Sequence, residues 1–478
     1  MKAGAKRRAR RARIQFLLTG LLGLGTPGLA LAESAYRILA AADLAALTSR
    51  FEPGDEVILP NATWKDTRLT FRGKGTAEKP IRLRADTPGG LVLTGKSQLV
   101  IDGEWLVVSG VAVKDGGPEG DGIVLKGRYN RLTMSAMDGG TYQHFVRLYG
   151  TRHRVDHCYF ARKTSDDALL QVEVDAREPN DHRIDHNHFG ERAPLGRNGG
   201  EIMRVGYSYQ ATHLSRTVVE RNLFERCDGE IEIISSKSGE NVYRANTFRN
   251  CDGMLTLRHG DRNVVDGNFF FGEGKPNSGG IRIIGEDHVV TNNYIEGVMK
   301  GGIWVTAGIP NSEPKGYVQA TRALVAFNTI VASAGPYLDL AAGLNGAGRT
   351  LKPAEITIAN NVFVMGPGGK LWQGEEGEKW TWMGNIAHGT AATHTGVRSV
   401  DPQLVRAGDG WLRPSESSPV RRQAEGRFPN VTTDIDGDRR AEKTDVGCDD
   451  ATGNANPTPR SNRPLHAADV GPSWMKRG

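Results

Sequence analysis

The feature that most constrains this chain is an asparagine that recurs at nearly regular intervals, each time followed by one or two apolar residues. The eight instances begin at Asn187, Asn222, Asn246, Asn268, Asn293, Asn328, Asn361 and Asn385. The short intervals are 22 to 25 residues and the long ones are about ten residues longer. Such a unit holds three short strands and three turns, and it is too short for a propeller blade. We therefore predict an all-β fold, a single-stranded right-handed parallel β-helix.

Stacked coils give the recurring asparagine a physical role, because equivalent residues of a β-helix lie directly above one another. A buried amide is then satisfied by bonding from coil to coil. The 61 glycines and the low aromatic content of 7% also suit many short strands joined by turns. Residues 40–50 have helical spacing, and we expect a short N-terminal helix there that caps the open edge of the first coil.

The two ends of the chain have a different composition from the repeats. Residues 1–32 carry a basic head, a short apolar run and Ala30-Leu31-Ala32, which together predict a signal peptide cleaved near Ala32-Glu33. The mature protein is then secreted or periplasmic. Residues 33–450 form the predicted β-helix domain, and residues 451–478 are expected to be a flexible C-terminal tail.

Net charge argues against several partners once the leader is removed. The whole chain has a formal charge of +6, and seven of its basic residues lie in the leader, so the mature chain is close to neutral. We therefore expect no nucleic-acid partner and no membrane attachment after cleavage. An acidic ligand would need a local cluster of cations. Nothing in the sequence indicates the oligomeric state.

A second periodic set consists of polar or aromatic residues flanked on both sides by apolar ones. In a strand, the central residue of such a triplet points outward. The predicted outward column is Arg147, Gln171, Arg204, Glu232, Thr256, Arg282 and Trp304. Cations, a carboxylate and an aromatic on one outer face favour a binding surface over a plain solvated sheet.

The densest group of charged residues lies at the centre of this column. Glu230 and Glu232 stand two residues apart, so both side chains leave one face of a strand about 6–7 Å apart. A calcium ion between them would relieve their repulsion, although a solvated carboxylate pair is the simpler alternative. Alignment of successive coils brings Lys237, Arg258 and His259 to the same outer face.

That alignment matches Cys227 with Cys251, one coil apart. Stacking at this distance permits a disulfide, but we favour a pair of buried thiols.

Several motifs together carry a resemblance to a known family. They are Pro53-Gly54-Asp55, Gly73-Lys74-Gly75-Thr76, Asn198-Gly199-Gly200-Glu201, Glu230-Ile231-Glu232 with Lys237-Ser238, and Arg258-His259-Gly260. With these motifs the chain resembles polysaccharide lyase family 6, which contains alginate lyases and chondroitinase B. The resemblance implies Ca²⁺ as cofactor with Asn198, Glu230 and Glu232 as its ligands. It also implies Lys237 as Brønsted base, Arg258 as Brønsted acid, and His259, Arg282 and Arg204 as substrate-binding residues.

The chemistry of uronates agrees with these roles. Removal of the C5 proton next to a carboxylate builds negative charge, which a calcium ion and nearby cations would stabilise. The Lys237 amine must be neutral to accept that proton. A guanidinium has a pKa above about 12, so Arg258 could instead stabilise the departing oxygen while His259 or water supplies the proton. Trp304 could offer a ring face to a sugar.

The predicted function is therefore a polysaccharide lyase acting on an acidic polysaccharide. Alginate is favoured as the commoner substrate of the family, and a chondroitinase B-like dermatan sulfate lyase is the alternative. A β-helix glycoside hydrolase would need groove carboxylates placed for acid and base catalysis with water. A non-catalytic glycan-binding β-helix would not need carboxylates, a lysine and an arginine to converge.

Overall fold

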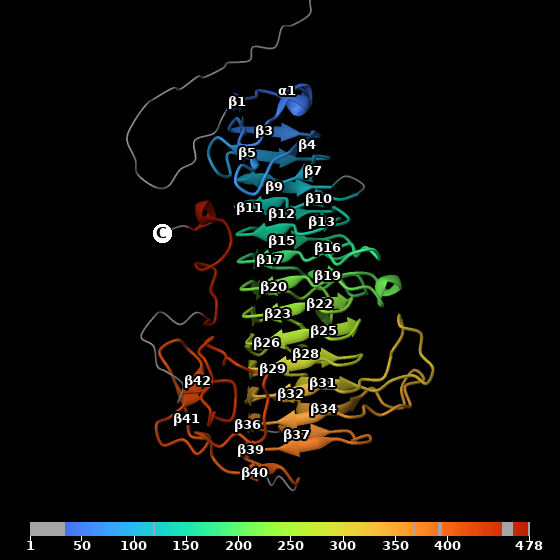
Figure 1. Cartoon of the computed structure of the whole chain (residues 1–478), viewed down its shortest axis with the longest axis vertical. Helices are drawn as coiled ribbons and strands as arrows, with labels where there is room; N and C mark the ends of the chain where they lie inside the picture. The colour runs from blue at the N-terminus through green and yellow to red at the C-terminus, as the bar shows by residue number, and fades with distance from the viewer. Residues whose placement is uncertain (1–33, 118–119, 368, 391–393, 452–461, 477–478) are drawn as a thin grey trace, which may run out of the picture.

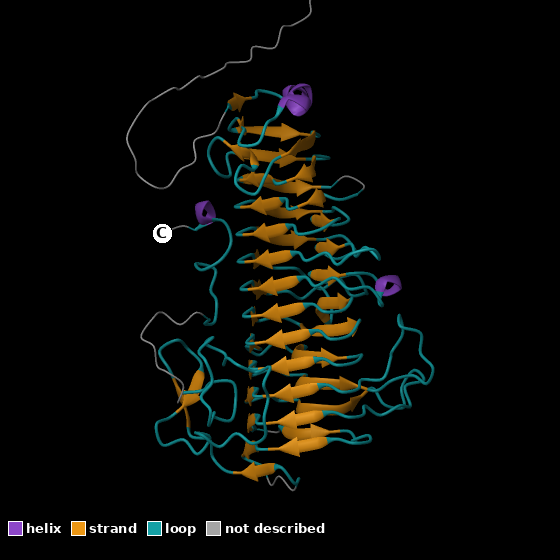
Figure 2. Cartoon of the chain, in the orientation of Figure 1, coloured by secondary structure: helices purple, strands orange, loops and turns teal. Residues whose placement is uncertain are grey.

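The computed structural model describes residues 34–117, 120–367, 369–390, 394–451 and 462–476. The predicted signal peptide lies outside these residues. Three long parallel sheets run the length of an elongated stack of coils, and strands make up most of its regular structure (Figures 1 and 2). Each coil contributes one strand to each sheet. The predicted parallel β-helix is confirmed.

Sheet A has 14 strands. They are β1 (Ala35–Arg37), β2 (Glu56–Leu59), β5 (Ile81–Ala85), β8 (Leu106–Ser109), β11 (Arg131–Thr133), β14 (Arg154–Asp156), β17 (Arg183–Asp185), β20 (Val218–Glu220), β23 (Val242–Arg244), β26 (Val264–Asp266), β29 (Val289–Thr291), β32 (Leu324–Ala326), β35 (Thr357–Ala359) and β38 (Thr381–Met383).

Sheet B also has 14 strands. They are β3 (Ala62–Lys65), β6 (Leu91–Thr94), β9 (Val111–Gly116), β12 (Ala136–Gly140), β15 (Tyr159–Lys163), β18 (His188–Phe189), β21 (Leu223–Glu225), β24 (Thr247–Arg249), β27 (Phe269–Phe271), β30 (Tyr294–Glu296), β33 (Thr329–Val331), β36 (Val362–Val364), β39 (Asn385–His388) and β40 (Val397–Ser399).

Sheet C has 12 strands and its outer face carries the candidate site. They are β4 (Arg68–Lys74), β7 (Gln98–Glu104), β10 (Ile123–Arg128), β13 (Val146–Leu148), β16 (Leu170–Val172), β19 (Met203–Val205), β22 (Glu232–Lys237), β25 (Gly253–His259), β28 (Ser278–Ile283), β31 (Gly301–Thr306), β34 (Pro336–Ala342) and β37 (Lys370–Gln373).

The recurring asparagines form a continuous buried ladder at the turn from sheet A to sheet B. In each step the side-chain oxygen of one asparagine accepts both the backbone and the side-chain N–H of the asparagine one coil earlier, as Asn246 does for Asn222 at 3.1 and 3.0 Å. The same pair of bonds links all eight from Asn187 to Asn385. The residue before each has a φ between 53 and 63°, which turns the chain sharply there. The predicted ladder is confirmed.

Removal of one rung should destabilise the protein measurably. In Asn246→Ala, the backbone and side-chain N–H groups of the buried Asn222 lose the oxygen of Asn246 as their shared acceptor. Each orphaned buried donor costs about 1–3 kcal/mol, so we expect unfolding to become easier by roughly 2–5 kcal/mol. Urea denaturation of this variant and of the exposed control Asn277→Ala would measure it. Equal midpoints for the two variants would contradict the role of the ladder.

The N-terminal cap is the short helix α1 (Ala41–Leu47), which continues into the 3-10 turn η1 (Thr48–Arg50). Leu44 and Leu47 are buried against the first coils and belong to the main core. The helix thus covers apolar side chains that the terminal coil would otherwise expose, as the spacing of residues 40–50 predicted (Figure 2).

The C-terminal region leaves the stack and packs beside it. Strands β41 (Leu404–Arg406) and β42 (Leu412–Pro414) pair antiparallel, and Trp411 between them packs against Phe269 and Tyr294 of sheet B. Residues 462–476, including the turn η3 (Ser473–Met475), then run back along the stack (Figure 1). The Trp474 indole N–H donates to the carbonyl of Met134. Residues 462–476 therefore differ from the flexible tail expected for 451–478.

All four cysteines are free thiols and buried, and the Cys227 amide donates to the Cys251 sulfur at 3.3 Å. The preferred prediction of stacked buried thiols is confirmed.

Among the described residues, no helix is long and apolar enough to cross a membrane.

Candidate active site

The candidate site lies on the outer face of sheet C, over strands β22, β25 and β28. Two loops project from the same side of the stack beside these strands (Figure 1). One follows β19 and contains the 3-10 turn η2 (Ser208–Gln210), and the other is the long connection 307–323 between β31 and β32. The chain is returned to the same outer face in every coil, so residues far apart in sequence meet there.

The outward column differs from the predicted one at a single position. Strand pairing aligns Arg204 with Ser235, and Ser235 with Thr256. The prediction that Glu232 occupies this column is wrong, because a register shift between Glu232 and Ile234 displaces it. The pair Ile233-Ile234 lies at the shift. With two consecutive apolar residues, the sequence does not say which of them points into the core. Arg147, Gln171, Thr256, Arg282 and Trp304 stand in the predicted column.

Three carboxylates converge beside the column. Glu201, Glu230 and Glu232 each place one oxygen within 4.8 Å of the others. Glu232 is the first residue of β22, Glu230 lies two residues before that strand, and Glu201 comes from the preceding coil. Like charges at this spacing repel strongly unless cations lie among them.

Two of the three carboxylates already have cationic partners. Arg204 donates two hydrogen bonds to Glu201, at 3.0 and 2.9 Å. Arg258 and Arg282 approach the same oxygen of Glu232, at 3.9 and 4.0 Å. Glu230 is the third carboxylate of the cluster.

Glu230 differs from its two neighbours because its hydrogen-bond partner is a backbone amide. The Gly199 N–H donates to it at 3.1 Å, and no described side chain forms an ion pair with it. A half-buried carboxylate beside two others, with oxygen donors converging, is the donor set that a calcium ion prefers. The residues therefore fit such an ion.

The titration of Glu230 gives a first test of this cluster. Burial, together with the Glu201 and Glu232 carboxylates, raises the pKa of Glu230 from 4.5 to about 7. The folded state thus favours the protonated group, and its contribution to stability is full below about pH 4.5 and is lost as the pH rises through about 7. In calcium-free buffer, the wild type should lose thermal stability over this range more steeply than Glu230→Gln. Parallel pH profiles for the two proteins would contradict it.

Lys237 lies at the end of β22, with its amine 3.7 Å from the Glu201 carboxylate. The side chain is largely buried. Burial, reinforced by the positive charges of Arg204 and Arg258, lowers the pKa of Lys237 from its ordinary value of 10.5. A lysine of lowered pKa has the neutral form available as a base.

Arg258 is held by the long loop that projects beside the site. Its guanidinium donates to the Gly316 carbonyl at 2.9 Å and stacks on the Tyr317 ring at 4.2 Å, both in loop 307–323. His259 beside it is buried, hydrogen-bonds Ser208 of η2 at 3.2 Å and has no exposed surface. Burial and the charges of Arg258 and Lys237 lower the pKa of His259 to about 3, so its ring is neutral at ordinary pH.

The remaining predicted residues are placed less centrally. Arg204 is buried beneath the acidic cluster, Arg282 is mostly covered, and Trp304 follows Arg282 in the column. Asn198 is exposed next to Gly199, and the described residues include no hydrogen-bond partner for its side chain. The structure thus brings Glu230, Glu232, Lys237, Arg258 and Arg282 together, with Arg204 and His259 behind them.

Sequence reasoning missed Glu201 and Tyr317. Glu201 belongs to the Asn-Gly-Gly-Glu motif quoted above, so the motif itself was its signal. Tyr317 lies 59 residues beyond Arg258 in an irregular loop, where no period places it against the site.

Two buried cations behind the carboxylates were also missed. Lys163 and Arg192 donate mainly to backbone carbonyls, among them those of Asp167 and Gly199. Lys163 bonds only within its own loop, whereas Arg192 bonds to carbonyls of that loop and of the segment that ends at Glu201, and so ties the two together.

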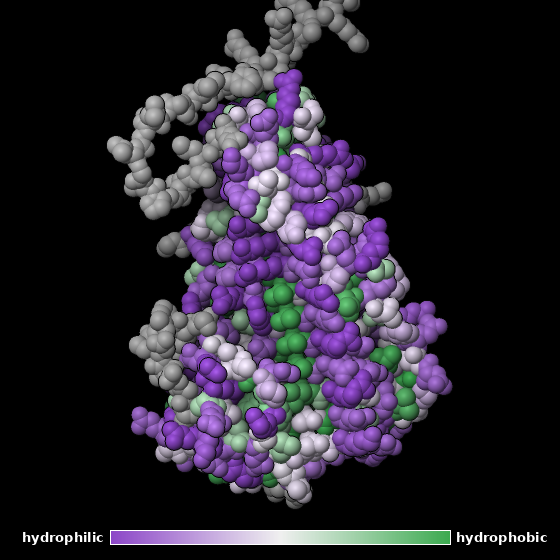
Figure 3. All heavy atoms as spheres, viewed as in Figure 1, coloured by the Kyte–Doolittle hydropathy of each residue, from purple (hydrophilic) through white to green (hydrophobic). Residues whose placement is uncertain are grey.

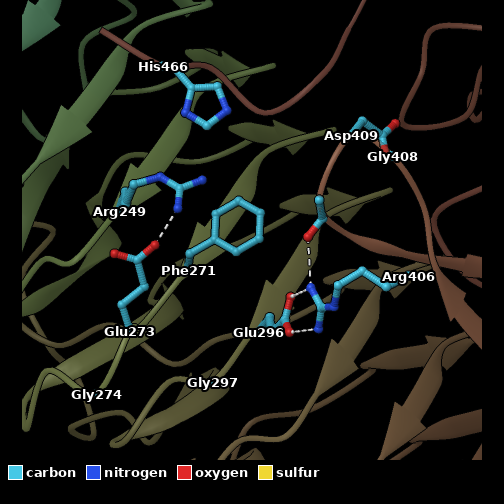
Figure 4. Close-up of a pocket in the computed structure, with 11 residues that line it drawn as sticks. Arg249, Phe271, Glu273, Gly274, Glu296, Gly297, Arg406, Gly408, Asp409 and His466 are labelled. Atoms are coloured by element: carbon cyan, nitrogen blue, oxygen red, sulfur yellow. Dashed lines mark hydrogen bonds and ion pairs between the residues drawn. The ribbon is translucent and has the colours of Figure 1, made fainter.

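The surface has two hollows of similar volume, one that adjoins this site and one that lies away from it. One of about 540 Å³ adjoins it on the N-terminal side and includes Asp167, which approaches Arg204 at 3.5 Å. A more enclosed one of about 520 Å³ lies between sheet B and the C-terminal segment (Figure 4). There Arg249 pairs with Glu273 and Arg406 pairs with Glu296, so its main charges are matched.

The space-filling view is consistent with a mainly polar exterior. Hydrophilic residues dominate the visible face, and hydrophobic ones gather in a column along the lower half of the stack (Figure 3).

Comparisons with known proteins identify the family. The family model described as chondroitinase B matches residues 39–368. The alginate lyase AlyGC of family PL6 is 32% identical, with a TM-score of 0.79 over 92% of this chain and 59% of that one. The chain thus spans about three fifths of AlyGC. None of the curated proteins matches the chain.

Two further solved structures cover most of their own length. A mannuronic acid specific polysaccharide family 6 lyase from human gut microbiota is 32% identical, with a TM-score of 0.68 over 77% of this chain and 91% of that one. The PL6 lyase Pedsa3628 from Pseudopedobacter saltans is 23% identical, with a TM-score of 0.72 over 92% and 99%, which supports the fold. From the matched family model and the identity to the gut lyase, the chain belongs to polysaccharide lyase family 6.

Proposed function

We propose that the protein cleaves alginate by calcium-assisted β-elimination and leaves 4,5-unsaturated uronate ends. The observation that carries the proposal is the meeting of a lysine of lowered pKa, an arginine and a three-carboxylate cluster on one outer face. A water-using glycosidase needs a carboxylic acid and a carboxylate base set for that task. Here the carboxylates are gathered at one point and the neighbouring titratable group is an amine.

The proposed division of labour follows from the contacts. The neutral amine of Lys237 accepts the C5 proton of the uronate, and Glu201 at 3.7 Å orients that amine. Arg258 and Arg282, the cations nearest the acidic pair, hold the substrate carboxylate and the sugar oxygens around the bond that breaks. Arg204 keeps Glu201 ionised and in place through its paired hydrogen bonds.

We further propose Ca²⁺ as the cofactor, held by Glu230 and Glu232, with Asn198 and Glu201 as additional oxygen donors. When bound, the ion would neutralise the substrate carboxylate and the charge that develops beside it during proton removal. The three clustered carboxylates and the unpaired state of Glu230 support this assignment.

Alginate is proposed over dermatan sulfate because two relatives at 32% identity are described as an alginate lyase and a mannuronic acid specific lyase. The family model bears the name of chondroitinase B, which keeps a dermatan sulfate lyase as the second candidate. Both are acidic polysaccharides. With the signal peptide predicted for residues 1–32, we propose that the enzyme meets such a polymer in the periplasm or outside the cell.

The test is a substrate panel. Purified mature protein is incubated with polymannuronate, polyguluronate and dermatan sulfate while the ultraviolet absorbance of the unsaturated product is followed. We expect a rise with an alginate block, its loss in excess chelator and its recovery with added calcium. Activity confined to dermatan sulfate would replace the proposed substrate. Cleavage with no unsaturated product would overturn the lyase reaction itself.

A further inference from the structure

Arg192 is a buried arginine whose hydrogen bonds all go to backbone carbonyls of two neighbouring loops. In loop 164–169 it donates to the carbonyls of Ser165 at 2.9 Å and Asp167 at 3.0 Å. In the segment before β19 it donates to the carbonyls of Gly199 at 3.1 Å and Glu201. None of the described carboxylates forms an ion pair with it. A buried charge without an ion pair is costly, so these four carbonyls must be held firmly around it.

The Gly199 residue is held from both sides by this arrangement. Its N–H donates to the Glu230 carboxylate at 3.1 Å, and its carbonyl accepts from Arg192. Its φ of 101° is a conformation that favours glycine, the residue with the most conformational freedom. The direction of this segment therefore has to come from its contacts. The amide that Glu230 accepts is the one that joins Asn198 to Gly199, so the same contacts fix Asn198 as well.

Arg192 is also attached to the chain that leads into Glu230. Its own carbonyl accepts the Asp228 N–H at 2.9 Å. A Cβ on Gly229 would lie 3.1 Å from Cδ of Arg192 and 2.1 Å from the Gly200 carbonyl oxygen, so only a glycine leaves room for the arginine and for the coil beneath it. The arginine thus contacts both of the segments that carry the acidic cluster.

We propose that Arg192 is a positioning residue for calcium, which fixes Asn198 and Glu201 relative to Glu230 without binding the ion itself. This inference rests on the proposed function and deepens it. A guanidinium suits the task because its rigid planar fork of five donors binds several carbonyls at once. A lysine ammonium is a compact charge on a flexible stem, with three donors, and cannot hold four carbonyls of two loops.

Arg192→Lys tests the proposal because it keeps the charge and removes the fork. Isothermal titration of the calcium-free protein should show calcium binding weakened roughly 10- to 100-fold, the usual cost of losing a group that holds metal ligands in place. Arg440→Lys is the matched control. Arg440 also donates to backbone carbonyls, those of Gly447 and Cys448, and it contacts Asn292 at the turn from sheet A to sheet B. This control should bind calcium as the wild type does.

The hydration of a terbium ion, used as a luminescent substitute for calcium, separates positioning from a purely structural role. Luminescence lifetimes in H₂O and D₂O give the number of waters on the bound ion. If Asn198 is displaced, a water takes the place of the lost oxygen, so Arg192→Lys should hold about one water more than the wild type. Unchanged calcium affinity, or unchanged hydration of the ion, would overturn the proposal even if the variant melts at a lower temperature.

Gly199→Ala tests the same peptide if Arg192→Lys does not fold. A side chain is strained at this φ, and the Cβ would lie 3.2 Å from the Asp167 nitrogen, so the segment should shift and calcium affinity should fall by a similar factor. Wild-type affinity in Gly199→Ala would overturn the proposal. If the wild type itself binds neither calcium nor terbium, the calcium site of the proposed function has failed, which is a different result.

Discussion

Lys237→Met should lower kcat on alginate roughly 10²- to 10⁴-fold, because it removes the base that accepts the C5 proton. Methionine is close in length to lysine and fills the same largely buried position, so the acidic cluster should stay in place. The loss should appear in kcat rather than in KM, since the amine acts during proton transfer. Initial rates of unsaturated product at several substrate concentrations measure both constants.

Chemical rescue gives this prediction a strict control. Lys237→Cys should be inactive, and alkylation that adds an aminoethyl group should restore much of the activity by rebuilding an amine at the same place. The four native cysteines are buried, so the new thiol is the preferred target. Lys114→Met on sheet B is the matched substitution that should leave the rate unchanged. Full activity of Lys237→Met would remove the proposed base.

Glu232→Gln should weaken calcium binding on the order of 100-fold, about 2.8 kcal/mol, because it removes one of the charges on which oxygen-ligand sites depend. It should also slow cleavage roughly 10²- to 10³-fold, the usual cost of losing one electrostatic contact to developing charge. The amide keeps the shape of the side chain. Arg258 and Arg282 approach its Oε1 at 3.9 and 4.0 Å, so both lose the same counter-charge.

Isothermal titration of the calcium-free protein measures the first effect independently of activity. Glu273→Gln, in the separate hollow beside sheet B, is the control that should bind calcium as the wild type does. Unchanged calcium affinity in Glu232→Gln would contradict the proposed metal site, whatever its effect on the rate.

The repeat predicted much of the fold because a β-helix imposes a local rule in every coil. Each ladder asparagine meets the next one, so a period in the sequence is directly a period in space. The predicted column of outward residues followed from the same rule. The rule failed at Glu232. Because Ile233 and Ile234 are both apolar, either of them could be the inward residue, and the alternation does not reveal the bulge that the chain adopts there.

The rest of the site depends on loops that interrupt the period. Arg258 reaches the Gly316 carbonyl across 58 residues, and Tyr317 follows in a connection with no repeat of its own. Lys163 and Arg192 look like surface residues in the sequence, yet they are buried because loop carbonyls surround them. Contacts of this kind arise from loop conformation, which neither spacing nor composition encodes.

The most direct measurement is a crystal structure of Lys237→Met with calcium and an oligouronate. It should place a uronate carboxylate between the metal and the arginines of sheet C, with calcium on Glu230 and Glu232 and the sugar C5 facing residue 237. A sugar chain bound elsewhere, such as the hollow between sheet B and the C-terminal segment, with no metal at these carboxylates would contradict the account.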